Sequence, residues 1–80
     1  MAKAYVLINC DLGSEDDMIR DIRKLEYVKD GTVTFGAYDI VSRVEADTPE
    51  QLREVITWKI RKMNKIRSTL TLMEVEGQGE

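Results

Sequence analysis

The chain has 80 residues, of which 42% are hydrophobic and 34% are charged, a composition typical of one small globular domain. It contains no histidine and a single cysteine, which excludes an internal disulfide and a cysteine-built zinc site and argues against hydrolases that need a histidine base. The net charge of −3 has the wrong sign for a domain that holds nucleic-acid phosphates unaided.

The sequence shows no signal for a membrane or for secretion. No apolar run approaches the roughly 18 residues that a membrane span needs, and the amino end lacks the small-residue cleavage site of a signal peptide. We therefore expect a cytoplasmic protein without a membrane partner. The residue inventory also leads us to expect no catalytic residue, no metal and no cofactor.

The first half of the chain predicts a strand and then a helix. The strand covers residues 4–10, and its two faces carry Ala4, Val6, Ile8 and Cys10 on one side and Tyr5, Leu7 and Asn9 on the other. Both faces are therefore largely apolar. The helix covers about residues 15–25, because Ser14 can cap its start with Asp17 three residues later. Cys10 is expected to be an inert core thiol.

A hairpin is predicted next, with strands over residues 27–35 and 38–46 and a tight turn at Gly36-Ala37. In its second strand, Ile40, Ser42, Val44 and Ala46 share one face, and Val41, Arg43 and Glu45 share the other. This alternation is typical of a strand with one buried face.

The last predicted elements are a helix and a strand. Thr48 is the N-cap of a capping box with Gln51, and Pro49 occupies the first helical position. The buried side of the helix comprises Leu52, Val55, Ile56, Ile60 and Met63, with Trp58 flanking it. The strand covers residues 66–76, with Ser68, Leu70 and Leu72 on one face and Thr69, Thr71, Met73 and Val75 on the other. Residues 76–80 are a polar tail of one domain that spans 1–80.

This order of elements, βαββαβ, predicts an α+β fold of the ferredoxin-like type. In that fold two helices cover one face of an antiparallel sheet. The other face is expected to carry Tyr5, Leu7, Val41, Thr69, Thr71 and Met73, a set too apolar to face water. We therefore expect a dimer formed by packing two sheets face to face, with Tyr5, Leu7, Val41 and Met73 in its interface.

The turn Gly36-Ala37-Tyr38-Asp39 is the candidate binding site. Gly36 permits a positive φ and the close approach of another molecule, while Tyr38 offers a hydroxyl group. Asp39 can accept a hydrogen bond from an ammonium group or from amides of the turn. A glycine turn capped by Asp39 explains the same residues without any ligand.

Two charged runs have plainer explanations. The acidic run at residues 14–17 could bind a divalent cation, but carboxylates at a helix start also complement the helix dipole. The basic run at residues 59–67 suits the carboxyl end of a helix. It could also contact nucleic acid or an acidic partner.

With "FGAYDIV" at the hairpin and "NKIRSTLTLMEVE" in the last strand, the chain resembles the effector-binding RAM domain of the Lrp/AsnC family of feast/famine transcriptional regulators. The resemblance covers residues 4–76. It implies a dimeric α+β barrel, rings of such dimers, and a small effector, usually an amino acid, bound between dimers. The motif residues are Gly36, Tyr38 and Asp39, with Ala37 between them. Ser68, Thr69 and Thr71 are further ligand candidates, although cross-strand packing also explains them.

Regulators of this family carry an amino-terminal helix-turn-helix, whereas this sequence starts directly at the first strand. The resemblance therefore implies a stand-alone module that modulates transcription by co-assembly with DNA-binding relatives, without binding DNA itself. Two alternatives stay open: an enzyme of the dimeric α+β barrel type, and an RNA-binding module of the same element order with Phe35 and Tyr38 as stacking residues. The missing histidine counts against the first and the acidic charge against the second.

Overall fold

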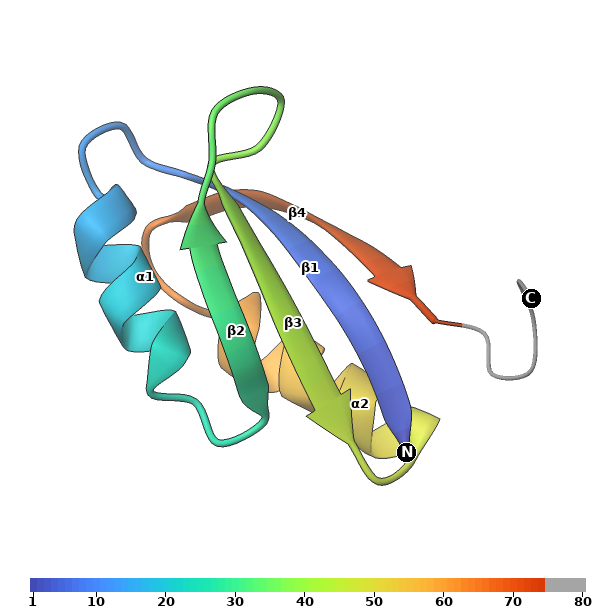
Figure 1. Ribbon diagram of the computed structural model, residues 1–80. Coiled ribbons are helices and arrows are strands. Elements are labelled where there is room, and N and C mark those ends of the chain that lie inside the picture. Colours follow the sequence, from blue (N-terminus) through green and yellow to red (C-terminus); the bar gives the residue numbers. More distant parts are fainter. Residues whose placement is uncertain (75–80) are drawn as a thin grey trace.

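The computed structural model describes residues 1–74, so the predicted face of Val75 and the polar tail at 76–80 lie outside the described residues. Its elements are β1 (Ala2–Cys10), α1 (Glu15–Arg23), β2 (Val28–Val33), β3 (Ile40–Ala46), α2 (Pro49–Val55), the π-helical turn η1 (Ile56–Ile60) and β4 (Ile66–Met73). The predicted βαββαβ order is confirmed (Figure 1). Among the described residues, no helix has the length and apolar character needed to cross a membrane.

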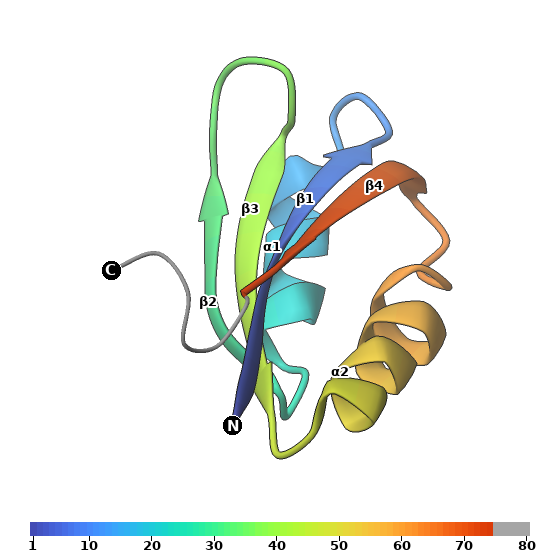
Figure 2. The same ribbon diagram turned by 90° about the vertical axis from the view of Figure 1, so that its right-hand side faces the viewer.

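The four strands form one antiparallel sheet in the order β2-β3-β1-β4. The central strand β1 pairs with β3 on one side and with β4 on the other. Both helices lie on the same face of this sheet (Figure 2). In the part of the chain that the structure describes, no helix covers the opposite face, which is called the open face below.

The core fills the space between the sheet and the two helices. It consists of Ala4, Val6, Ile8, Cys10, Met18, Ile19, Ile22, Val28, Ile40, Val44, Ala46, Leu52, Val55, Ile56 and Ile60. The predicted alternation of β1 and β3 is confirmed, because their buried residues are every second one. Ser42 is also buried, and its hydroxyl donates a hydrogen bond to the Val6 carbonyl at 3.1 Å. Its burial therefore leaves no unsatisfied polar group.

The two helix starts behave differently. At α2 the predicted cap is confirmed, since the Gln51 amide N–H donates to Thr48 Oγ1 at 3.1 Å. The Gln51 side chain accepts from the backbone N–H of Asp47 at 3.1 Å, one residue before the position that a capping box predicts. At α1 the predicted side-chain cap is wrong: the Ser14 hydroxyl instead donates to the Asp11 carbonyl at 2.6 Å and closes the preceding turn.

Beyond Val55 the second helix widens into η1, in which the Arg61 N–H donates to the Ile56 carbonyl at 2.9 Å. This five-residue spacing defines a π-helical turn. It keeps Ile56 and Ile60 buried, while Trp58 between them is 58% exposed. Trp58 therefore points away from the core more fully than its position beside the buried stripe predicted.

The pairing of β1 with β4 corrects one prediction. Thr71 lies opposite Val6 and Thr69 lies opposite Ile8, so both threonines are on the helix-covered face. Met73 shares this face and packs against the core. The prediction that Thr69, Thr71 and Met73 lie on the open face is therefore wrong. Alternation shows which residues share a face, but it does not say which face is covered when both sets are half apolar.

The open face instead carries Leu70 and Leu72. Leu70 lies opposite Leu7 and Leu72 lies opposite Tyr5, while Val41 flanks Leu7 on the other side of β1. Leu72 is 50% exposed. Leu70, Leu72 and Ser68 thus take the places predicted for Met73, Thr71 and Thr69. The face remains largely apolar, which supports the argument for a covering partner.

Candidate functional site

The hairpin between β2 and β3 is longer than predicted. The strands end at Val33 and resume at Ile40, so residues 34–39 form an open loop instead of a tight turn at Gly36-Ala37. Two hydrogen bonds close its base, both involving Thr34: its amide N–H donates to the Asp39 carbonyl and its hydroxyl donates to the Tyr38 carbonyl, each at 2.8 Å. The loop is thus held at its base and projects from one end of the sheet (Figure 1).

Gly36 adopts a φ of 128°, as the sequence predicted. No heavy atom lies within 4 Å of the position that a Cβ would occupy there, so backbone conformation and not crowding calls for glycine. Gly36 and Ala37 are exposed, and Tyr38 is half-buried. Within one chain the loop therefore presents a surface to which a ligand or a second molecule has free access.

Asp39 ties this loop to the end of β1. Its backbone N–H donates to the Ile8 carbonyl at 2.9 Å, and its Oδ2 accepts from the Cys10 N–H at 3.0 Å. One carboxylate oxygen of Asp39 therefore has a structural role, but it binds the end of β1 and not, as the ligand-free explanation predicted, an amide of its own turn. The other oxygen accepts no hydrogen bond from the described residues, so it can still meet a cationic group.

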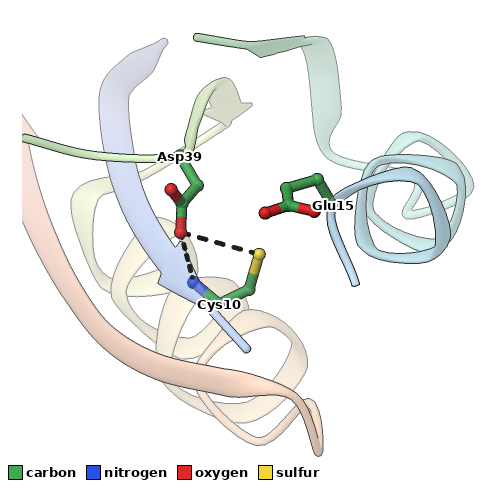
Figure 3. Close-up of side chains that lie close together, drawn as sticks. All are labelled: Cys10, Glu15 and Asp39. Atoms are coloured by element: carbon green, nitrogen blue, oxygen red, sulfur yellow. Dashed lines mark hydrogen bonds between the residues drawn. The ribbon is translucent and has the colours of Figure 1, made fainter. Parts of the chain in front are cut away.

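Cys10, Glu15 and Asp39 bring one potential metal-ligand atom each within 4.8 Å of one another (Figure 3). Burial raises the pKa of the Cys10 thiol, and the nearby carboxylates of Asp39 and Glu15 raise it further. A hydrogen bond from Ser14 lowers this pKa, but the net shift is upward. The thiol therefore stays protonated, with its Sγ 3.8 Å from Asp39 Oδ2. These donors could hold a zinc-like ion only after the thiol loses its proton.

The three ligand candidates on β4, Ser68, Thr69 and Thr71, lie on different faces of the sheet. Ser68 lies on the open face, where its Oγ accepts a hydrogen bond from Asn9 Nδ2 at 3.4 Å. Asn9 adjoins Cys10, so Ser68 sits at the same end of the sheet as the 34–39 loop. Thr69 and Thr71 lie on the opposite face, as described above. A ligand at the loop that reaches along the open face would meet Ser68, but not the two threonines.

The comparisons with known proteins decide the family. A family model for the Lrp/AsnC ligand binding domain matches residues 3–76. The chain belongs to this family. FFRP-DM1 is 35% identical, with a TM-score of 0.90 and coverage of 94% of this chain and 100% of that one. A hypothetical protein from Pyrococcus horikoshii is also 35% identical, with a TM-score of 0.89 and coverage of 94% and 90%.

More distant structures show the fold alone. The AsnC protein of E. coli is 21% identical, with a TM-score of 0.87, and the match covers 99% of this chain and 54% of that one. No curated protein compared with this chain matches it. The family is a ligand-binding family of transcriptional regulators and not a family of enzymes.

Two exposed residues of this Lrp/AsnC domain had no place in the predicted binding site. Phe35, in the 34–39 loop, is 106% exposed, and Leu12, in the loop that joins β1 to α1, is 96% exposed. The sequence could have indicated both residues, since each is a large apolar residue between turn residues.

The RNA-binding alternative requires aromatic residues on the open face of the sheet, where bases can stack. Phe35 and Tyr38 lie in the 34–39 loop and not on that face, so these two residues do not provide this stacking surface.

Proposed function

We propose that this Lrp/AsnC domain binds a small-molecule effector, an amino acid, at the 34–39 loop and, as an oligomer, modulates transcription through DNA-binding relatives. The observation that carries the proposal is the anchored loop: Asp39 uses one oxygen to hold it in place and keeps the other for a ligand. The ammonium group of an amino acid would meet that oxygen, and its carboxylate would meet exposed amides at Gly36 and Ala37.

The relatives support an amino acid as the ligand. A transcriptional regulator from Neisseria meningitidis, 9% identical to this chain with a TM-score of 0.83, was solved as a complex with L-Met. Which amino acid this chain prefers depends on the residues around the loop. The exposed Phe35 offers an apolar surface beside the site, which favours an apolar side chain over a charged one.

The open face supports dimerisation. Tyr5, Leu7, Val41, Leu70 and Leu72 form an apolar surface that a second copy would cover by packing sheet against sheet. Arg43 on this face is already paired, because its guanidinium donates to Asp30 at 2.9 Å and to Glu45 at 2.8 Å. Covering the face would therefore not leave the Arg43 guanidinium unpaired.

DNA recognition would come from a partner. The matched family model is that of a ligand-binding domain, and a net charge of −3 disfavours direct phosphate binding by this domain. Co-assembly with relatives that carry a helix-turn-helix would connect effector binding to DNA in the cytoplasm. In such a mechanism this chain would compete with the subunits of those relatives for places in the oligomer.

Calorimetric titration with each of the twenty amino acids tests the proposal. For the amino acid that binds, Asp39→Asn is expected to weaken binding by about 1 to 3 kcal/mol, the usual scale for a hydrogen bond to a charged group. Asparagine keeps an acceptor for the Cys10 N–H, so the loop should remain anchored. The outcome against the proposal is that no amino acid binds to the wild-type chain.

The control variant is Asp47→Asn, which removes the same charge from an exposed position in the β3–α2 connection, at the other end of the sheet (Figure 1). It should bind as the wild type does. Equal affinity of wild type and Asp39→Asn would mean that Asp39 only caps the loop and that the ligand binds elsewhere.

A further inference from the structure

Three side chains with metal-binding atoms meet where β1, α1 and the 34–39 loop come together. Cys10 is the last residue of β1, Glu15 is the first of α1, and Asp39 is the last of the loop. Their potential ligand atoms all lie within 4.8 Å of one another, and Figure 3 shows both carboxylates next to the thiol. From the sequence we expected no metal, because these residues lie up to 29 positions apart and only the fold brings them together.

The spacing of two of these atoms is close to that around a bound zinc ion. Zinc binds sulfur at about 2.3 Å and carboxylate oxygen at about 2.1 Å in a tetrahedral arrangement, so the sulfur and the oxygen are about 3.6 Å apart. Cys10 Sγ lies 3.8 Å from Asp39 Oδ2. The Cys10 N–H donates to the same oxygen at 3.0 Å, and such hydrogen bonds orient ligands at metal sites. These two ligands are therefore already nearly in place.

The charge at this position also favours a cation. The carboxylates of Glu15 and Asp39 are half-buried, and no ion pair among residues 1–74 includes either of them. Two carboxylates this close repel each other, and a cation between them removes the repulsion. A divalent ion held by two carboxylates and a thiolate forms a group with a single net negative charge. Such a group suits the positive amino end of α1.

The donor atoms indicate which ion fits. Calcium and magnesium prefer oxygen ligands alone, whereas zinc accepts sulfur and oxygen together in sets of four. A thiol that coordinates zinc loses its proton to do so. Cys10 is 4% exposed, so the ion would enter from the side of the two half-buried carboxylates. With three protein ligands, the fourth position of a zinc ion is open to water.

We propose that Cys10, Glu15 and Asp39 bind one zinc ion per chain. The inference is independent of the proposed function, because it uses Asp39 Oδ2 and leaves the other oxygen for the effector. The bound ion joins the end of β1 and the start of α1 to the 34–39 loop. It therefore holds the loop more firmly than the hydrogen bond to Cys10 alone.

Titration with cobalt(II) tests the site, because cobalt occupies tetrahedral zinc sites and absorbs in the near ultraviolet when a thiolate binds it. The full chain is stripped of metal with a chelator, kept reduced, and titrated with cobalt and then with zinc. The wild type should develop the sulfur-to-cobalt band, which saturates at one ion per chain and disappears as zinc displaces cobalt. Cys10 is the chain's single cysteine, so the band reports this site alone.

Variants identify the other ligands. Cys10→Ser should abolish the band, and Glu15→Gln should weaken zinc binding at least about tenfold, since even residues behind the ligands contribute that much. Asp16→Asn, which removes an exposed carboxylate from the next position of α1, should bind as the wild type does. Circular dichroism checks that each variant folds. No band, saturation at one ion per two chains, or equal affinity of wild type and Glu15→Gln would overturn the proposal.

Thermal unfolding gives a second readout. Excess zinc should raise the Tm of the wild type, because an ion that binds the folded chain stabilises it, and should leave the Tm of Cys10→Ser unchanged. An equal rise in both would place the ion elsewhere and contradict the site. Amino-acid titrations in chelator test the proposed function separately. Amino-acid binding without a zinc site would contradict this inference alone, and a zinc site without amino-acid binding would contradict the proposed function alone.

Discussion

Among single residues, Cys10 shows how position controls chemistry. It is 4% exposed at the end of β1, where its backbone N–H is bound by Asp39 and its thiol faces the carboxylates of Asp39 and Glu15. Burial and these negative charges raise its pKa. Since the thiolate is the nucleophile, the cysteine should be inert in the folded chain, as a core thiol is expected to be.

We predict that Cys10 reacts with a thiol reagent more slowly in the native chain than in urea, because burial limits access and the raised pKa leaves less of the reactive thiolate. The folded chain holds the thiol proton more tightly than the unfolded chain. Its contribution to stability is therefore complete below the usual thiol pKa of about 8.5 and is lost as pH rises further.

Two measurements check this prediction. Reaction rates in buffer and in urea give the reactivity, and urea unfolding of wild type and Cys10→Ser at pH 7 and pH 10 gives the stability. The serine variant should lose less stability on going to pH 10. Equal rates in the folded and unfolded chain would show that the thiol is accessible and ionised, contrary to its position in the structure.

At the level of elements, the two helix starts contrast. Thr48 satisfies an amide of the first turn of α2, and Gln51 reaches back to the preceding residue. Ser14 gives no such help to α1. That helix instead begins with Glu15, Asp16 and Asp17, whose charges complement the positive end of the helix dipole. Each helix therefore starts by a different physical means.

We predict that Thr48→Ala lowers the free energy of unfolding by about 1 kcal/mol, the typical cost of losing an N-cap side chain. Urea unfolding at one fixed protein concentration measures it, because oligomer stability depends on concentration. Thr57→Ala, at an exposed position in η1, is the control and should change stability by no more than about 0.5 kcal/mol. Similar losses in the two variants would argue that Thr48 contributes through something other than its cap.

For the whole molecule, the main feature is the open face, an apolar surface that the helices of the same chain do not cover. Leu7 lies between Val41 and Leu70 across three neighbouring strands. Such a continuous apolar surface is unfavourable in water, and a domain of 80 residues has only a small core of its own. A second copy would remove this surface from water and add a second core.

We predict that Leu7→Asp converts the dimer to a monomer, because a carboxylate buried without a partner costs several kcal/mol. Analytical ultracentrifugation at micromolar concentration measures the mass, and circular dichroism checks that the fold is kept. Arg53→Asp places the same group on the helix layer and should leave the sheet-to-sheet dimer intact. A dimeric Leu7→Asp protein would place the interface on another surface.

Local patterns in the sequence were sufficient for most of the fold. The alternation in β1 and β3, the cap at Thr48 and the apolar stripe of α2 predicted the elements and their buried sides, because each depends on neighbours close along the chain. The glycine at position 36 and its positive φ were likewise predicted, together with the family motif that contains it. The family itself followed from that motif in the right hairpin.

Only the tertiary structure decided which face of β4 is covered and how the 34–39 loop is held. In β4 both sets of alternating residues are half apolar, so the register against β1 determines that Met73 turns inward and Leu72 outward. The loop is anchored to the end of β1 because Asp39 binds the Cys10 N–H, a contact between residues 29 positions apart. Such contacts depend on how distant segments are brought together, which a local pattern does not record.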